Sequence, residues 1–356
     1  MRSTYHVLNL DKKAVFVVWG PPSVGPRSQV LARELGVSRL YYIHPNTPRG
    51  LASALYRYAW QARATWRILR EQRPPLVFVQ SPPTLAVLSV LAYTRTAHAR
   101  YIVDAHSAAF LHWFWRSPGW LFRRLARNAI TTLVTNSHFA SQIQAAGGNA
   151  LVLRDIPTTF EQTPHSFDGA FNIVVVNTFA PDEPLSEILD AARDLPDIQF
   201  YVTGKRKSAP AALLSRAAPN VHFTDFLPDK EYYGMLAACD AVMCLTTRDH
   251  TMQRGACEAL TLGKPIITSD SELLRDYFRQ GTVHVANTRA AIRQGIERMR
   301  AEHARYRAEI VALQQEQQHE WEEKRGKLLK QIQQALTMSG GYNSLAERDA
   351  HVKESL

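Results

Sequence analysis

Asp104 and His106 end an apolar run, Tyr101–His106, that has the composition of a buried strand. Side chains two residues apart on a strand share a face, so both can point into one cleft. A histidine titrates near neutrality, and a neighbouring carboxylate can orient its ring. The pair is therefore a candidate catalytic group, and a histidine hydrogen-bonded within the sheet is the structural alternative.

A second carboxylate, Glu258, lies in the apolar helical run Ala256–Leu260. A charge in such a place is costly unless it is paired. An ionised carboxylate can accept two hydrogen bonds from a pair of sugar hydroxyls. An ion pair with a neighbouring arginine or lysine would satisfy it equally, and the spacing alone favours the ion pair.

The residues before Glu258 have the character of an anion site. A polar loop, Thr246–Thr251, separates an apolar strand from a predicted helix, Met252–Leu262. In open α/β sheets, ligands bind beyond the carboxyl ends of the strands, where helix N-termini offer unpaired N–H groups. Small residues at Gly255 and Ala256 would let phosphate oxygens approach the backbone, and Arg254 adds a positive charge.

Two other loops are weaker candidates for contact with an anion. Lys205 and Arg206 directly follow a predicted strand, where they serve either as phosphate ligands or as part of a solvated turn. The loop Trp19–Arg27 has glycines at both ends, including Gly25, but lacks the spacing of a dinucleotide fingerprint. We therefore predict no NAD binding there, and a structural turn explains the loop equally well.

Short apolar runs alternate with helical patterns along both halves of the chain. The strands expected in the first half are Ala14–Gly20, Arg39–Pro45, Leu76–Gln80, Tyr101–His106, Thr132–Ser137 and Ala150–Ile156. Those expected in the second half are Phe171–Asn177, Gln199–Thr203, Val221–Phe226, Ala241–Thr246, Pro265–Ser269 and Val283–Ala286. Repeated strand–helix–strand order predicts parallel sheets covered on both faces. The expected fold is α/β, with two doubly wound Rossmann-like domains and a long C-terminal helix.

The domain limits follow from changes in composition. An N-terminal domain is expected over residues 1–157, followed by a polar linker. A second domain covers residues 170–287, and a charged helical segment covers residues 288–337. The polar tail, residues 338–356, is expected to be disordered.

Charge is unevenly divided. Residues 1–150 hold 18 Lys+Arg and 4 Asp+Glu, a net charge of +14, and the remainder holds 24 and 28, a net charge of −4. Within the basic half, residues 110–127 mix aromatic side chains with arginines: Phe110, Trp113, Phe114, Trp115, Arg116, Trp120, Phe122, Arg123, Arg124 and Arg127. Such a mixture suits the headgroup layer of an anionic membrane. Contact with nucleic acid, or a core helix with a charged face, would use the same residues.

Other features indicate a cytoplasmic protein. The three cysteines lack metal or CxxC spacing, which is typical of reduced thiols in the cytosol. The N-terminal residues carry charges and no apolar stretch, so we expect no secretory signal. The uncharged segment Pro74–Thr94 has the length of a membrane span, but its four prolines favour a strand followed by a helix. We expect attachment at the inner face of the membrane without a spanning helix.

The stretch Asn220–Asp270 resembles the signature region of retaining GT-B glycosyltransferases of the family 4 type. The matching features are CDAVMCLTT, a polar loop and RGACEALTLGKPIITSD, and the resemblance is strongest over residues 171–287. It implies a nucleotide-diphosphate sugar as donor, with Glu258 on the ribose hydroxyls. The donor site implied by the match consists of Asp249, His250, Thr251, Met252, Gln253, Arg254, Gly255 and Glu258. The loop containing Gly25 would lie under the donor phosphates and sugar.

The resemblance also assigns a role to His106 near the donor sugar, with Asp104 as its orienting partner or as the acceptor base. The sequence departs from the family at two places. His250 stands where the family has a second glutamate that contacts the donor sugar, and the segment Asn177–Glu183 lacks the family's Arg…Lys pair. Lys205 or Arg206 is the substitute phosphate ligand that we expect.

The predicted activity is transfer of a hexose-type sugar from a nucleotide-diphosphate donor to a lipid-linked or saccharide acceptor at the cytosolic membrane face. No metal-ligand spacing is present, and neither a metal nor another cofactor is expected. A sugar-nucleotide epimerase or phosphorylase shares the fold and is the enzymatic alternative. The third hypothesis is a non-catalytic basic protein that binds membranes or nucleic acid. No nucleic-acid-binding motif is present, so only the charge supports a nucleic-acid partner.

Overall fold

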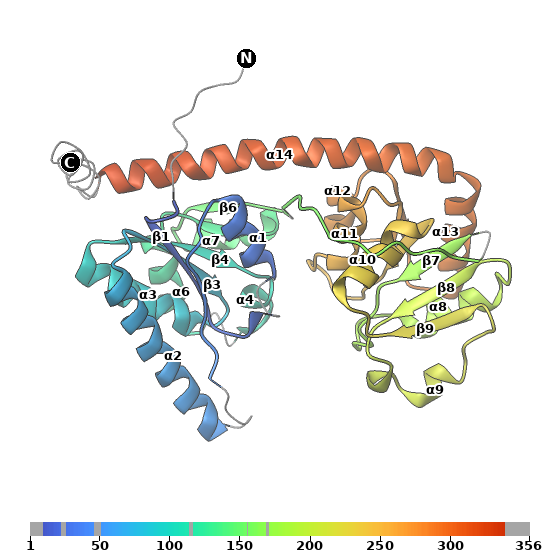
Figure 1. Cartoon of the computed structure of the whole chain (residues 1–356), viewed down its shortest axis with the longest axis horizontal. Helices are drawn as coiled ribbons and strands as arrows, with labels where there is room; N and C mark the ends of the chain where they lie inside the picture. Colours follow the sequence, from blue (N-terminus) through green and yellow to red (C-terminus); the bar gives the residue numbers. More distant parts are fainter. Residues whose placement is uncertain are drawn as a thin grey trace, which may run out of the picture. The chain divides into compact units, whose positions relative to one another are not determined.

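The computed structural model describes residues 10–22, 26–45, 51–113, 117–154, 156–168 and 171–338. The chain divides into two compact units, unit 1 (Met1–Ile156 with Trp321–Leu356) and unit 2 (Pro157–Glu320). Each unit contains its own six-stranded parallel sheet (Figure 1). Gly25, the segment 114–116 and all of the expected disordered tail except Met338 lie outside the described residues.

The first sheet has the strand order β2-β1-β3-β4-β5-β6. Its strands are β1 (Ala14–Val18), β2 (Leu40–Tyr42), β3 (Leu76–Ser81), β4 (Arg100–Ala105), β5 (Thr132–Val134) and β6 (Ala150–Val152). Every residue of β1 and β3 is buried, because helices cover both faces of the sheet. This burial explains why these strands are continuous apolar runs in the sequence.

Two layers of helices cover the first sheet. The helices among the described residues of unit 1 are α1 (Pro26–Glu34), α2 (Leu51–Gln72), α3 (Thr84–Ala97), α4 (Ala108–Leu111), α6 (Gly119–Asn128), α7 (Ser137–Ala145) and part of α14 (His303–Met338). On one face, α2, α3, α6 and α7 share a single hydrophobic core with the sheet. On the other face, α1 packs with Trp321, Leu328 and Ile332 of α14. The C-terminal half of α14 is therefore part of unit 1.

The second sheet has the order β12-β11-β10-β7-β8-β9, with all strands parallel. Its strands are β7 (Asn172–Val175), β8 (Gln199–Thr203), β9 (Val221–Asp225), β10 (Ala241–Cys244), β11 (Ile266–Ser269) and β12 (Thr282–Val285). From β7 the chain adds β8 and β9 on one side, then returns to add β10 on the other. The strand order therefore reverses between β7 and β10.

The helices of unit 2 also form two layers. They are α8 (Leu185–Arg193), the short η2 (Arg206–Ser208), α9 (Ala211–Leu214), α10 (Asp229–Ala238), α11 (Arg254–Thr261), α12 (Glu272–Tyr277), α13 (Arg289–Ala301) and the start of α14. One core contains residues of α8 and α13, and the other contains residues of α10, α11 and α12. The two-domain α/β fold with a long C-terminal helix, predicted from the sequence, is confirmed.

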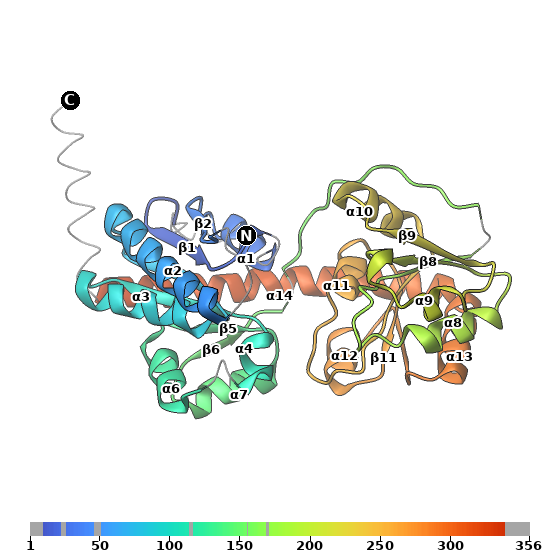
Figure 2. The same ribbon diagram turned by 90° about the horizontal axis from the view of Figure 1, so that it is seen from below.

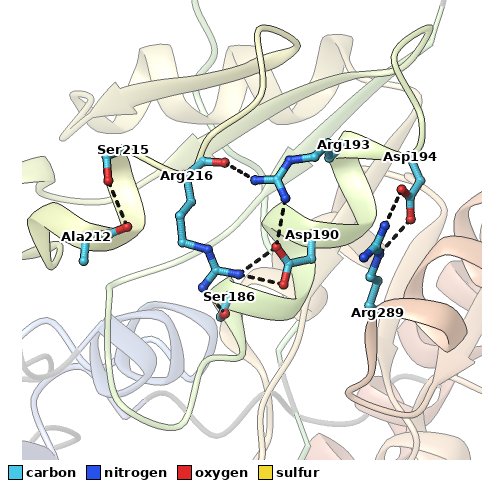
Figure 3. A network of polar contacts seen from close by, with 8 residues as sticks. All are labelled: Ser186, Asp190, Arg193, Asp194, Ala212, Ser215, Arg216 and Arg289. Carbon is cyan, nitrogen blue, oxygen red and sulfur yellow. Dashed lines mark hydrogen bonds and ion pairs between the residues drawn. The ribbon is translucent and has the colours of Figure 1, made fainter.

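Surface ion pairs join the elements on the α8 side of this sheet (Figure 3). Arg216, after α9, donates to both carboxylate oxygens of Asp190 on α8 at 2.7 Å. Arg289 binds Asp194 in the same two-pronged way, at 2.6 and 2.8 Å, and so joins α13 to the end of α8. Both pairs are exposed, so each contributes little to stability. In both pairs, the positive charge of the arginine is balanced by a carboxylate.

Candidate functional site

The second sheet has its topological switch point between β7 and β10. In open α/β sheets, ligands bind outside the carboxyl ends of the strands at such a point. The two loops that leave the sheet there are residues 176–184, after β7, and residues 245–253, after β10. The second of these loops contains most of the donor-site residues implied by the sequence.

Asp182 connects the two loops. Its backbone oxygen accepts a hydrogen bond from the Thr247 N–H at 2.8 Å, and its Oδ2 accepts one from the Thr246 hydroxyl at 3.1 Å. The Arg248 guanidinium forms an ion pair with Oδ1 at 3.0 Å, without the alignment of a hydrogen bond. Sequence reasoning missed Asp182, because its partners lie more than 60 residues away along the chain. The aspartate fixes the loops relative to each other at the switch point.

Glu258 is buried on α11 and surrounded by three donors. Arg254 Nε lies 2.7 Å from Oε1, the Tyr232 hydroxyl 2.7 Å from Oε2, and the Tyr233 hydroxyl 3.4 Å from Oε1. Burial and the nearby carboxylate raise the pKa of Tyr233 to about 12 and that of Tyr232 well above its ordinary value. Both tyrosines are therefore protonated donors at neutral pH. The ion pair that the spacing favoured is present, and the carboxylate keeps capacity for another hydrogen bond.

Gly255 permits close packing at the start of α11. A Cβ atom there would lie 2.6 Å from Cγ1 of Val176, the residue that follows β7. The glycine therefore brings the first turn of α11 against the end of β7. The sequence predicted that Gly255 lets a phosphate approach the backbone. The structure adds a second reason for a glycine here, which is close packing against Val176.

The first turn of α11 also contacts a buried thiol. Cys244 Sγ donates to Oε1 of Gln253, the residue directly before α11, at 3.1 Å. Burial raises the pKa of Cys244 to about 12, so the sulfur stays protonated. All three cysteines are buried, and none of them forms a disulfide.

The remaining donor-site residues form the approach to α11. Asp249 and His250 lie in an exposed turn, and His250 has a left-handed backbone with φ of 54°. Thr251 and Met252 continue the loop, so the helix begins at Arg254, two residues after the predicted start. The eight implied donor-site residues therefore occupy the loop after β10 and the first two turns of α11.

Lys205 and Arg206 lie exposed in the turn after β8, the strand next to β7. The Lys205 ammonium lies 5.4 Å from the centre of the Phe226 ring, and the Arg206 N–H donates to Asp225 Oδ1 at 3.1 Å. Gly204 makes this turn possible, because its φ is +108° and a Cβ would lie 2.4 Å from the Asn177 oxygen. The basic turn therefore borders the loop after β7.

The loop after β7 closes on its own carboxylate. Glu183 accepts hydrogen bonds from the Thr178 N–H at 2.8 Å, the Thr178 hydroxyl at 3.0 Å and the Ala180 N–H at 2.9 Å. This is the segment in which the family's Arg…Lys pair is missing. The carboxylate of Glu183 therefore occupies two N–H groups of the loop that could otherwise bind a phosphate.

In unit 1, Asp104 and His106 lie together as the strand spacing predicted. His106 Nε2 lies 3.4 Å from Asp104 Oδ2, and the Asp104 side chain is fully buried. Burial alone would raise the pKa of Asp104, but the charge of Arg27 and the hydrogen bonds of its neighbours hold it well below its ordinary value. Complete burial keeps the carboxylate from a substrate. Of the two roles left open, the geometry favours the orienting one.

Arg27 and Ser28 at the start of α1 complete this cluster. Arg27 Nε lies 3.2 Å from Asp104 Oδ1, and its other nitrogens donate to the backbone oxygens of Leu153 and Arg154 at 2.8 and 3.0 Å. The Ser28 hydroxyl donates to Asp104 Oδ2 at 2.7 Å. Neither residue was expected in the cluster from the sequence. The signal was the buried aspartate itself, which requires a charged partner.

The structure divides the aromatic and basic stretch 110–127. Phe110 is a core residue that stacks on Phe139 at 4.4 Å, so it is not a membrane contact as the stretch suggested. Trp113 and Trp120 are exposed, and so are the three described arginines of α6. Trp115, Phe114 and Arg116 lie outside the described residues.

Among the described residues, no group of three or more His, Cys, Asp or Glu side chains is placed to hold a metal ion. Within the same residues, no helix is both long enough and apolar enough to cross a bilayer. Pro74–Thr94 instead contributes β3 and most of α3, as its prolines indicated.

Residues 171–302 match the family model described as Glycosyl transferases group 1. The match covers the sheet with the switch point and all of the implied donor-site loop. Among curated proteins, none matches the sequence of the chain. The sequence evidence for this family therefore rests on unit 2.

Solved structures share the fold along most of the chain. Sucrose-phosphate synthase from Thermosynechococcus elongatus has a TM-score of 0.68 at 13% identity, covering 92% of this chain and 100% of its own. HepE from Anabaena in complex with UDP-glucose has a TM-score of 0.65 at 12% identity, covering 89% and 99%. A proposed UDP-N-acetylglucosamine 2-epimerase from Listeria monocytogenes has a TM-score of 0.61 at 11% identity, covering 83% and 91%. At identities this low, the structural likeness establishes a shared GT-B fold and no more.

Proposed function

We propose that the chain is a glycosyltransferase that moves a hexose-type sugar from a nucleotide-diphosphate donor to an acceptor. The observation that carries the proposal is the group 1 glycosyltransferase match over residues 171–302, centred on a switch point where Glu258 lies buried. Glucose linked to UDP is the first donor to test, because it is bound in the structure of HepE. Following the resemblance, the reaction would retain the configuration at the anomeric carbon.

In this proposal, Glu258 accepts a hydrogen bond from the donor ribose while Arg254 and Tyr232 hold the carboxylate in place. The segment Asp249–Gln253, with Lys205 or Arg206, contacts the diphosphate and sugar. His106 acts at the donor sugar, and Asp104 fixes its ring. The reaction uses no metal or other cofactor.

The acceptor in this proposal is lipid-linked or a saccharide, and the protein works at the inner face of the cytoplasmic membrane. The net charge of +14 on residues 1–150, against −4 on the rest, supports an anionic surface as partner of unit 1 only. The exposed Trp120 and the arginines of α6 support it too.

Binding is tested first with a panel of nucleotide-sugars. A ligand that binds only the folded protein raises its melting temperature, so the preferred donor is the one that stabilises most. Calorimetry then compares wild type with Glu258→Gln, which keeps the shape of the side chain and removes its charge. Losing a charge-assisted hydrogen bond to the ribose costs about 1.5–3 kcal/mol, roughly ten- to a hundredfold in affinity.

The matched control is Glu297→Gln. Glu297 pairs with Arg293 four residues earlier on α13 at 3.1 Å, as Glu258 pairs with Arg254 on α11. We expect the control to bind the donor as wild type does. If Glu258→Gln lowers the melting temperature yet binds the donor with unchanged affinity, the carboxylate is a structural ion pair and the site assignment is wrong.

An epimerase is the second candidate, favoured by the structural likeness to the Listeria monocytogenes protein. The products distinguish the two activities. A transferase releases the nucleoside diphosphate as it moves the sugar to the acceptor. An epimerase returns a nucleotide-sugar in which the configuration of the sugar has changed.

A further inference from the structure

One face of α2 carries a row of exposed side chains that changes from apolar to basic along the helix. We call it the α2 stripe, and it consists of Leu55, Tyr56, Trp60, Arg63, Arg67 and Arg70. Leu55, Tyr56 and Trp60 are 77, 61 and 39% exposed. The row from Tyr56 repeats every three or four residues, so its members lie on one side of the helix. It extends along about 22 Å of helix.

The arginines of the α2 stripe differ from many of those of unit 2. On unit 2, Arg216, Arg289 and Arg293 each pair with a carboxylate. Among the described residues, Arg63, Arg67 and Arg70 form no ion pair. They line a hollow of the surface together with Trp60, Arg73 and one carboxylate, Glu71, with which none of the three forms an ion pair. A row of unmatched arginines next to exposed aromatic side chains indicates an anionic partner with an apolar boundary.

The neighbouring helices extend this surface. Helix α3 packs against α2 on one side and α6 on the other, so the three form one layer over the first sheet. Figures 1 and 2 both show α2 and α3 side by side. The three helices contain eight arginines and one acidic residue, Glu71. Leu85 of α3 and Trp120 of α6 are also exposed, at 39 and 60%.

We propose that the α2 stripe docks unit 1 on the surface of an anionic phospholipid bilayer. Leu55, Tyr56 and Trp60 enter the boundary between headgroups and acyl chains, and the three arginines bind lipid phosphates. The exposed aliphatic side chains favour lipid over nucleic acid, because leucine offers no ring on which a base could stack. The inference rests on the membrane placement proposed above and identifies the surface that achieves it.

Vesicle co-sedimentation of the full chain at physiological salt tests the proposal. The probes are vesicles of phosphatidylglycerol with phosphatidylcholine and vesicles of phosphatidylcholine alone. The variant combines Arg63→Gln, Arg67→Gln and Arg70→Gln. Each basic residue near an anionic surface contributes about fivefold in binding, so we expect the triple variant to bind anionic vesicles about a hundredfold more weakly.

The control combines Arg216→Gln, Arg289→Gln and Arg293→Gln in unit 2, which lowers the net charge by the same three units. These pairs are exposed, so the fold should tolerate their loss, and vesicle binding should match wild type. A second variant, Leu55→Ser with Trp60→Ser, keeps every charge and should also bind more weakly. Equal binding by the stripe variants and wild type would overturn the proposal. Equal binding of wild type to both vesicle types would do so too.

Two further readouts separate this inference from the proposed function. Calorimetry with UDP-glucose in lipid-free buffer should give the same affinity for wild type and the arginine triple variant. A loss there would overturn the docking proposal, because the stripe would then belong to the donor site or support it. Failure of both proteins to bind any nucleotide-sugar would reject the proposed function while leaving the vesicle result valid. Tight binding of single-stranded RNA, lost in the triple variant, without binding to vesicles would identify nucleic acid as the partner.

Discussion

Replacing Arg27 with glutamine should destabilise unit 1 strongly, because the change leaves the Asp104 carboxylate buried without its cation. The Asp104 side chain has no exposed surface, and that of Arg27 retains 15%. Removing one partner of a buried ion pair typically costs about 3–5 kcal/mol. Because Arg27 is slightly exposed and glutamine can keep one hydrogen bond to a backbone oxygen, we expect about 3 kcal/mol.

Unfolding in urea, followed by tryptophan fluorescence, measures this effect on the full chain. All seven tryptophans belong to unit 1, so the signal reports on that unit alone. The control is Arg33→Gln, the same chemical change on the same helix, at a side chain that is 58% exposed. An exposed change of this kind should alter the free energy of unfolding by less than about 0.5 kcal/mol.

A double-mutant cycle tests whether the loss comes from the pair. Asp104→Asn removes the buried charge, so the double variant should be more stable than the sum of the single effects predicts, by about 1–3 kcal/mol. The reasoning is refuted if Arg27→Gln stays within about 1 kcal/mol of wild type. Strict additivity in the double variant would refute it as well, because the two side chains would then act independently.

Two further predictions concern the same cluster. His106→Ala should reduce turnover with the preferred donor more than it reduces donor affinity; near-normal turnover would make the histidine a structural residue of the sheet. Because the folded-state pKa of Asp104 lies below the unfolded value of 3.8, its stabilising contribution is complete above that pH and declines as pH falls through the folded pKa. The stability difference between wild type and Asp104→Asn, measured in urea, should therefore be constant near neutrality and shrink below about pH 4; a difference that stays constant down to pH 2 would contradict it.

The sequence predicted the strands well for a physical reason. Strands such as β1 (Ala14–Val18) are covered on both faces, so they appear in the sequence as short apolar runs without the spacing of a helix. Sheet order was not predictable, because it depends on which side of β7 the chain returns to. The apolar pattern of α14 does not by itself show its division between two cores, since Leu313 and Leu328 look alike in the sequence.

The candidate sites were predictable only as far as local spacing reaches. The contact of His106 with Asp104 follows from strand geometry alone. Glu258 has one partner close in the sequence and others far from it. Arg254 is one helical turn away and was foreseen as a possible ion pair, whereas Tyr232 comes from α10, 26 residues earlier. Tertiary contacts of this kind supply most of the burial and charge balance, and no local pattern encodes them.

Analysis of the reaction products tests the central claim most directly. The full chain is incubated with the nucleotide-sugar that stabilises it most and a cell-envelope lipid extract as the source of acceptor, and the nucleotide and sugar products are separated by chromatography. A glycosyltransferase should release free nucleoside diphosphate in equal amount to the sugar that appears on the acceptor, and Glu258→Gln should abolish both. A nucleotide-sugar recovered with only its sugar epimerised, or no nucleoside diphosphate from any donor in the panel, would contradict sugar transfer.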